Sequence, residues 1–172
     1  MNQYKTIEKI KSLLPAINGV QAALLYGSFG RNEANPNSDI DMQLLVNDNF
    51  LINDFKEKLQ QLFSEEVKAV NQIEMRDKVV VYFKNQPKLE MAICKSVSEV
   101  ERNYLGSEIT NNENTIIFEN KEANLNLRLH LQNLVQNKNQ AKTKEVKDTA
   151  INDLIEKFVY EFESCSNAHR RS

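Results

Sequence analysis

Residues 27–41 have the sequence GSFGRNEANPNSDID, in which a Gly-Ser pair precedes an Asp-x-Asp pattern by ten residues. Apolar runs flank this stretch: residues 22–26 (AALLY) come before it and residues 42–46 (MQLLV) follow it. The first run predicts a buried strand that ends at the Gly-Ser pair, and the second continues the aspartates as another strand. Residues 35–38 (NPNS) predict the turn that brings the chain back for this second strand.

Asp39 and Asp41 are predicted to lie side by side at the start of the second strand. Residues two apart in a strand project from the same face, so both carboxylates point one way while Ile40 points into the core. Two carboxylates held this close repel each other unless a cation lies between them. Carboxylate oxygens are ligands that Mg²⁺ prefers. The pair therefore predicts a magnesium site.

Gly27 and Ser28 supply the second requirement of a nucleotide site. Gly27 permits a sharp turn at the strand end and lets a ligand approach the backbone closely. Ser28 and the amides that follow it can open a short helix toward a phosphate group. We therefore expect phosphate binding directly beside metal binding.

Residues 27–34 (GSFGRNEA), followed by residues 37–41 (NSDID), resemble the signature of the DNA polymerase β-type nucleotidyltransferase superfamily. The most similar branch contains the aminoglycoside adenylyltransferases and the small antitoxin-like nucleotidyltransferases. The motif covers about fifteen residues, and the expected order of elements extends the resemblance over roughly the first hundred. Gly30 and Asn32 depart from the pattern, because the small enzymes more often have Ala and Gly at these positions.

The resemblance implies a third carboxylate on a later strand, and Glu90 matches that position. Residues 78–83 (KVVVYF) and 88–93 (KLEMAI) predict two strands joined by a turn at residues 85–87. On the second of these strands, Glu90 lies opposite the apolar face and is the one carboxylate. By resemblance, Glu90 binds metal, acts as the general base, or does both.

The resemblance also implies how the site residues divide their roles. Catalysis and the binding of two Mg²⁺ ions are assigned to Asp39, Asp41 and Glu90. Nucleotide binding is assigned to Gly27, Ser28, Arg31 and Ser38.

The order of the expected elements predicts an α+β protein with the nucleotidyltransferase fold, in which helices flank a small mixed sheet and a helical C-terminal part follows. Helical spacing of apolar residues predicts an opening helix over residues 4–17 and a second over residues 55–67. Asn53 is the expected N-cap of the second helix. A capping box at residues 96–99 (SVSE) opens a further short helix, and residues 115–118 are expected to be extended.

We divide the chain into a nucleotidyltransferase domain, residues 1–95, and a helical domain, residues 96–172, which is expected to be incomplete. The helical part contains a Leu-rich helix over residues 125–135 and a wide apolar stripe over residues 151–165. A two-helix pair covers only one side of this stripe. We therefore expect either a homodimer through the C-terminal helices or a longer protein whose missing part packs there.

Composition indicates a compact intracellular enzyme. The 172 residues are 41% hydrophobic, enough for a core, and their formal net charge of -2 disfavours long nucleic acid as a partner. No run approaches the roughly 18 apolar residues of a membrane span, and the N-terminus lacks the apolar region of a signal peptide. We expect a cytoplasmic location without a membrane partner. Cys94 and Cys165 are expected to be buried thiols.

The sequence favours an enzyme that transfers AMP from Mg-ATP to a hydroxyl group of a small molecule by a two-metal mechanism. An aminoglycoside-like antibiotic is the favoured acceptor by resemblance, which implies a role in antibiotic resistance. One alternative is an antitoxin-type nucleotidyltransferase that modifies or binds a helical partner toxin. Another is a non-catalytic regulator that binds nucleotide.

Overall fold

The computed structural model describes residues 2–106, 115–123, 125–127 and 129–133. Six strands form the centre of the fold: β1 (Val20–Tyr26), β2 (Ile40–Val46), β3 (Val67–Ile73), β4 (Lys78–Phe83), β5 (Leu89–Cys94) and β6 (Ile116–Glu119). The helices with defined bounds are α1 (Gln3–Leu13), α2 (Gly27–Gly30), α3 (Ile52–Leu62) and α4 (Val97–Gly106). Short 3-10 turns occupy Leu14–Ala16, Glu74–Arg76 and Lys121–Ala123.

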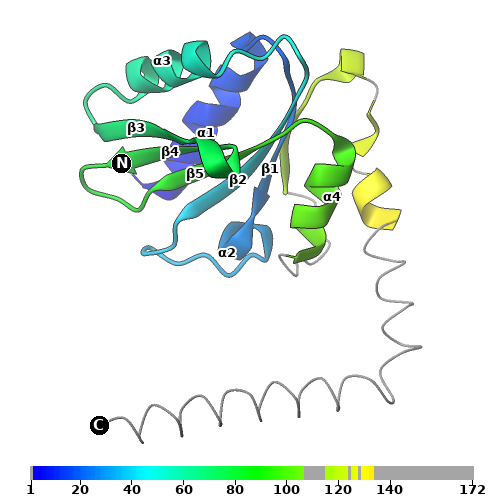
Figure 1. Ribbon diagram of the computed structural model, residues 1–172. Helices are drawn as coiled ribbons and strands as arrows, with labels where there is room; N and C mark the ends of the chain where they lie inside the picture. Colours follow the sequence, from blue (N-terminus) through cyan, green and yellow to red (C-terminus); the bar gives the residue numbers. More distant parts are fainter. Residues whose placement is uncertain (1, 107–114, 124, 128, 134–172) are drawn as a thin grey trace, which may run out of the picture. The chain divides into compact units, whose positions relative to one another are not determined.

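The strands form one sheet in the order β3-β4-β5-β2-β1-β6 (Figure 1). β2 and β5 run parallel, whereas each of the other neighbouring pairs is antiparallel. The predicted α+β class, with a mixed sheet and flanking helices, is thereby confirmed.

One face of the sheet carries the main hydrophobic core. Successive strand residues alternate between faces, and Ile40 and Met42 of β2 are fully buried on this one. Phe55 and Leu59, one helical turn apart on α3, pack into the same core as Ile10 of α1. Each large side chain buried in this way contributes about 1.5–3 kcal/mol. Packing on this face therefore holds β2 in place. The polar residues of β2 project from the opposite face of the sheet.

The opposite face of the sheet is apolar at one end and polar at the other. Leu45 and Cys94, which are register partners on β2 and β5, are buried there, and α4 contacts both strands (Figure 1). Cys94 is thus a buried thiol, as predicted, whereas Cys165 lies outside the described residues. Asp41 and Glu90 lie on this same face at the other end of the two strands.

The helix expected over residues 55–67 was predicted too long. α3 ends at Leu62, and residues 67–73 form β3, which the sequence analysis missed. Phe63 and Val67 continue the helical spacing of the preceding apolar residues, and this hid the strand-like alternation of VKAVNQI. Asn53 as N-cap was also wrong, because the N-cap is Leu51 and Asn53 lies within the helix.

Other expected elements have the predicted positions. β4 has the predicted bounds, and the bond from the Glu99 amide to the Ser96 hydroxyl, one of the two bonds of the predicted capping box, forms at the start of α4 with a length of 3.3 Å. The Glu99 carboxylate instead binds the amide of Lys95, the residue before Ser96, at 2.7 Å. The extended piece expected after α4 forms β6 and pairs with β1.

Residues beyond position 95 thus contribute a strand to the sheet, and a domain boundary at residue 95 stays a prediction. Residues 127 and 129–133 are helical, within the segment predicted to be a Leu-rich helix. The apolar stripe over residues 151–165 lies outside the described residues. Within the described ranges, no helix is long and apolar enough to cross a membrane.

Candidate active site

The turn from β1 into α2 brings the backbone of Gly27 against the side chain of Asp41. Gly27 has a φ of 59°, in the left-handed region that favours glycine. A Cβ atom placed on Gly27 would lie 2.4 Å from Asp41 Oδ2, well inside contact distance. The close approach of a ligand to Gly27 stays a prediction, and in the structure the group that lies against this glycine is the Asp41 carboxylate. Asn32, one of the two residues that depart from the motif, also has a positive φ, of 60°, which Asn tolerates.

Strand register aligns the predicted site residues Asp41 and Glu90 in one row with Tyr26. Tyr26 at the end of β1 lies opposite Asp41 of β2, and Asp41 lies opposite Glu90 of β5. Glu90 in turn lies opposite Val80 of β4. Because register partners project from the same face of a sheet, the carboxylates of Asp41 and Glu90 are neighbours.

Two lysines form ion pairs with Glu90, and one of them also pairs with Asp39. Lys88 Nζ hydrogen-bonds to Glu90 Oε1 and lies 3.5 Å from Asp39 Oδ2, so one ammonium group links both acids. Lys78 Nζ of β4 lies 3.0 Å from Glu90 Oε2. The Asp39 side chain is 42% exposed and that of Glu90 is 19% exposed. Asp39 is therefore open to a ligand from solvent, whereas Glu90 is enclosed by its two lysines.

The surroundings of Asp41 and Glu90 shift their pKa values in opposite directions. Burial raises the pKa of Asp41, and the charges of Glu90 and Asp39 raise it further. Hydrogen bonds from Lys88 and Lys78 lower the pKa of Glu90 despite its burial. Burial and the nearby Asp41 charge raise the pKa of the Tyr26 hydroxyl, which therefore stays protonated and can donate. Pairs of carboxyls with separated pKa values are typical of sites that move protons.

Three other predicted site residues lie on α2 and on the loop that follows it. Ser28 is half-buried on α2. Arg31 Nε donates to Glu33 Oε2 at 2.7 Å, and Ser38 Oγ accepts from the Asn35 amide at 2.9 Å. The side chains of Arg31 and Ser38 thus make contacts within the loop, and their assignment to nucleotide binding stays a prediction.

Sequence reasoning missed the roles of Lys78, Lys88 and Tyr26 in this arrangement. The alternation of β5 places Lys88 on the same face as Glu90, and this was a usable signal. The contact from Lys78 depends on the pairing of β4 with β5, and that of Tyr26 on the pairing of β1 with β2. Local sequence patterns do not give those registers.

The donor chemistry of the site fits Mg²⁺. Within the described part of the chain, no three His, Cys, Asp or Glu side chains are grouped so that they alone could hold a metal ion. Mg²⁺, however, usually takes one or two carboxylates together with water and substrate phosphates, and Asp39 and Asp41 can supply that number. The Lys88 ammonium lies beside these ligands, between Asp39 and Glu90.

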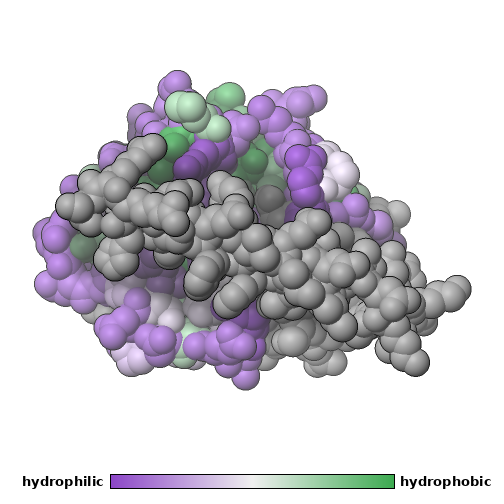
Figure 2. Space-filling view, turned by 60° about the horizontal axis from the view of Figure 1, so that its bottom comes forward, coloured by the Kyte–Doolittle hydropathy of each residue, from purple (hydrophilic) through white to green (hydrophobic). Residues whose placement is uncertain are grey.

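Figure 2 brings the end of the sheet where α2 lies toward the reader. Among the described residues that are visible in this view, hydrophilic ones are more common than hydrophobic ones.

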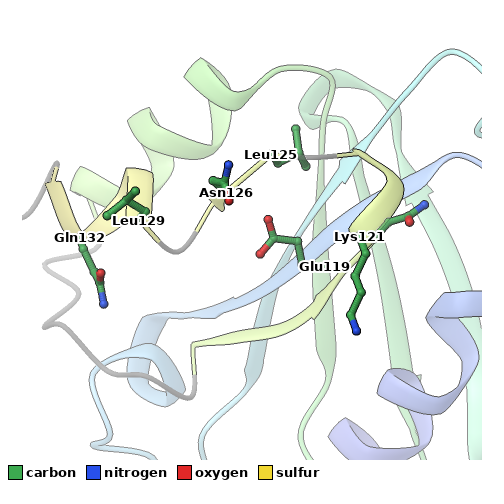
Figure 3. A pocket seen from close by; sticks show the side chains of 7 residues that line it. Glu119, Lys121, Leu125, Asn126, Leu129 and Gln132 are labelled. Atoms are coloured by element: carbon green, nitrogen blue, oxygen red, sulfur yellow. The ribbon is translucent and has the colours of Figure 1, made fainter.

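A separate pocket of about 510 Å³ lies beyond β6 (Figure 3). It is lined by Glu119, Asn120, Lys121, Leu125, Asn126, Leu129 and Gln132. Glu119 pairs with Ala22, four residues before Tyr26 on β1, so this pocket lies toward the other end of β1 from the carboxylates. Its lining includes none of the predicted site residues.

A mixed sheet with carboxylates on β2 and β5, beside a Gly-Ser turn at the end of β1, defines the nucleotidyltransferase fold. The family described as "Polymerase beta, Nucleotidyltransferase" matches residues 8–122, more than half of the chain, and the chain belongs to this family. The predicted resemblance is thereby confirmed, and nucleotidyl transfer is the general activity of the family.

Among solved structures, the chain is similar to the cyclic dinucleotide synthase CdnE of Elizabethkingia meningoseptica, whose structure was determined with GTP and Apcpp. The two sequences are 22% identical, and the TM-score is 0.39. The similarity covers 54% of this chain and 36% of the CdnE chain. No curated protein matches the chain.

Proposed function

We propose that this chain transfers a nucleoside monophosphate, AMP from Mg-ATP in the favoured form, to a hydroxyl group of a small molecule. The observation that carries the proposal is the row of Asp41 and Glu90 on adjacent strands, with Asp39 linked to Glu90 through Lys88. Membership of the nucleotidyltransferase family supports the reaction class. An aminoglycoside-like polycation is the favoured acceptor by resemblance.

In this proposal Asp39 and Asp41 hold Mg²⁺, and Glu90 contributes to the site of a second ion. When bound, the ions neutralise the triphosphate and lower the pKa of the acceptor hydroxyl. The raised pKa of Asp41 and the neighbouring carboxylates support this assignment, because each added positive charge relieves their repulsion.

The acceptor oxygen attacks the α-phosphorus in line and forms a new phosphoester bond. The bond between the α-phosphorus and the oxygen that bridges to the β-phosphorus breaks, and pyrophosphate leaves with the bonding electrons. The acceptor proton passes to Glu90. Ser28 and the amides at the start of α2 bind the phosphates, next to the turn at Gly27.

Glu90 can act as a base only after its ion pairs loosen. Hydrogen bonds from Lys88 and Lys78 lower its pKa, and this makes it a weak proton acceptor in the free protein. A triphosphate beside these lysines competes for the same ammonium groups. Transfer of Lys88 and Lys78 to phosphate oxygens raises the proton affinity of Glu90 when the substrate is in place.

The test is mass spectrometry of an acceptor panel incubated with Mg²⁺ and each of the four nucleoside triphosphates. The panel includes aminoglycosides, other polyhydroxylated small molecules and a helical toxin protein, which tests the antitoxin-type alternative. We expect a mass increase of one AMP on a small-molecule acceptor and none with the Asp41→Asn variant. Tight Mg-ATP binding without any transfer or pyrophosphate release would favour the non-catalytic regulator.

We also propose that the chain self-associates through the apolar stripe over residues 151–165. Several large apolar side chains repeat there at helical spacing, and their exposure to water is costly. Light scattering of the 172-residue chain is expected to give the mass of a dimer. A monomer with full transfer activity contradicts this proposal.

A further inference from the structure

The side chain of Gln3, in the first turn of α1, binds the loop that leads into Asp39. Gln3 is 7% exposed, and its Nε2 atom donates to three backbone carbonyl oxygens. The distances are 2.9 Å to Asn35, 3.1 Å to Pro36 and 2.8 Å to Ser38. One buried amide group, with two hydrogens shared among three acceptors, therefore joins the N-terminal helix to the turn before β2.

These contacts fix the orientation of the backbone at Asp39. The carbonyl of Ser38 and the amide nitrogen of Asp39 belong to one planar peptide unit. The hydrogen bond from Gln3 to Ser38 consequently limits rotation of that unit, to which the Cα atom of Asp39 is attached. Asp39 needs such support, because β2 begins only at Ile40.

The same turn of α1 also contacts the segment that carries Ser28. The ring of Tyr4 packs edge-to-face on Phe29 of α2, with 5.8 Å between centroids and an interplanar angle of 73°. The first turn of α1 thus touches both sides of the site: α2 through Tyr4, and the loop before Asp39 through Gln3. Neither contact is signalled by a local sequence motif.

We propose that Gln3 is a positioning residue, which holds the loop of residues 35–38 so that Asp39 is oriented for metal and nucleotide. The expected effect of Gln3 on nucleotide binding rests on the proposed function, whereas its effect on the order of the loop does not. The first measurement therefore uses hydrogen exchange of the free protein, and the second uses Mg-ATP binding.

Hydrogen exchange followed by mass spectrometry compares the parent with Gln3→Ala and Gln3→Glu. We expect exchange in the peptide of residues 35–41 to be at least roughly tenfold faster in both variants, because each loses the shared donor. The Gln3→Glu effect is expected to be the larger, since a carboxylate not only lacks the donor but also repels the three carbonyl oxygens. Gln3→Asn, which keeps the donor on a shorter side chain, replaces Gln3→Glu if the latter does not fold.

Gln86→Ala is the matched control. Gln86 Nε2 donates to Thr6 Oγ1 at 2.8 Å, so this variant also removes a glutamine hydrogen bond to α1, but on the β4-β5 turn. We expect it to leave exchange over residues 35–41 unchanged. Parent-like exchange in Gln3→Ala, or equal acceleration in Gln86→Ala, overturns the assignment.

Titration with Mg-ATP then separates positioning from direct participation. We expect Gln3→Ala to bind Mg-ATP about three- to tenfold more weakly, because only part of its population has the loop in the competent position. Saturating Mg-ATP is expected to restore the parent kcat, so that only KM differs from that of the parent. A lowered kcat at saturation overturns a pure positioning role. If the parent protein binds no Mg-ATP, the proposed function is wrong. Hydrogen exchange still tests whether Gln3 holds the loop of residues 35–38.

Discussion

Asp41 and Asp39 are two residues apart, yet different parts of the structure hold them. Asp41 lies within β2, between its register partners Tyr26 and Glu90, and the backbone of Gly27 lies against it. Asp39 precedes β2, and the peptide unit that leads into it is held by Gln3. A strand ladder fixes a side chain through many backbone bonds, whereas a loop is only as ordered as its few contacts. Substitution of the carboxylates on the strands should therefore reduce transfer activity severely. Substitution in the loop should have a mild effect that saturating ligand reverses.

The largest effect is expected for Asp41→Asn. The change removes a charge with little alteration of shape, and transfer should fall to background because the predicted metal ligand is lost. Folding should be retained or improved, since burial and like charges make the Asp41 charge costly. Transfer assays and thermal unfolding measure the two consequences. Parent-like transfer by this variant contradicts the metal assignment.

Glu90→Gln should lower the rate of transfer by roughly 10²- to 10⁴-fold, the loss expected for a general base. Nucleotide affinity should change less, because the Glu90 carboxylate is not itself assigned to phosphate binding. Glu66→Gln is the matched control: it removes the ion pair with Lys9, whose atoms are 2.9 Å apart at a more exposed position. A weakened affinity with an unchanged rate indicates that Glu90 serves binding and not proton transfer.

Gly27→Ala tests how closely the β1 turn supports Asp41. A Cβ atom at this position meets Asp41 Oδ2 at 2.4 Å, and the φ of 59° is unfavourable for alanine. We expect a loss of about 1–3 kcal/mol in the free energy of unfolding. We also expect transfer to fall by roughly 10²-fold through misplacement of the carboxylate. Gly30→Ala, within α2, should have little effect on either quantity. An equal effect of the two substitutions would show that the contact between Gly27 and Asp41 is not the cause.

Ser38→Ala tests how the loop before β2 supports Asp39. The change removes the hydroxyl that accepts from the Asn35 amide at 2.9 Å, a bond worth about 0.5–1.5 kcal/mol. Mg-ATP binding should weaken by a factor of a few, and saturating ligand should restore the rate. If Ser38 instead contacts the nucleotide in the reacting complex, the rate at saturation stays low. Calorimetry and steady-state kinetics distinguish these outcomes.

The smallest effect concerns the pH dependence of stability. The folded protein raises the pKa of Asp41 above its usual value of 3.8, so at low pH the protonated carboxyl carries no penalty. As pH rises through the folded pKa, the carboxyl ionises in an unfavourable environment and stability declines. Asp41→Asn should therefore gain stability relative to the parent as pH rises from about 4 to 7. Denaturant unfolding at several pH values measures this difference, and parallel curves contradict it.

The sequence predicted much of the frame of the site. Two apolar runs around the Gly-Ser and Asp-x-Asp residues predicted β1 and β2, because strand ends and glycine turns depend on local chemistry. Alternation alone placed Glu90 on the polar face of β5. β3 was missed because Val67 continues the helical spacing of α3, and only tertiary packing ends that helix at Leu62. Gln3 could not be found, since its contacts join positions more than thirty residues apart.

The parallel pairing of β2 with β5 also bears on the folding of the protein. Residues 42–89, including α3 and the β3-β4 hairpin, lie between Asp41 and Glu90 in the chain. Pairings across such separations form late and slowly, because the entropy of closing a long loop must be overcome first. A nascent chain that ends before β5 therefore carries the Asp-x-Asp motif without its third carboxylate. The row of Asp41 and Glu90 can assemble only after β5 joins the sheet beside β2.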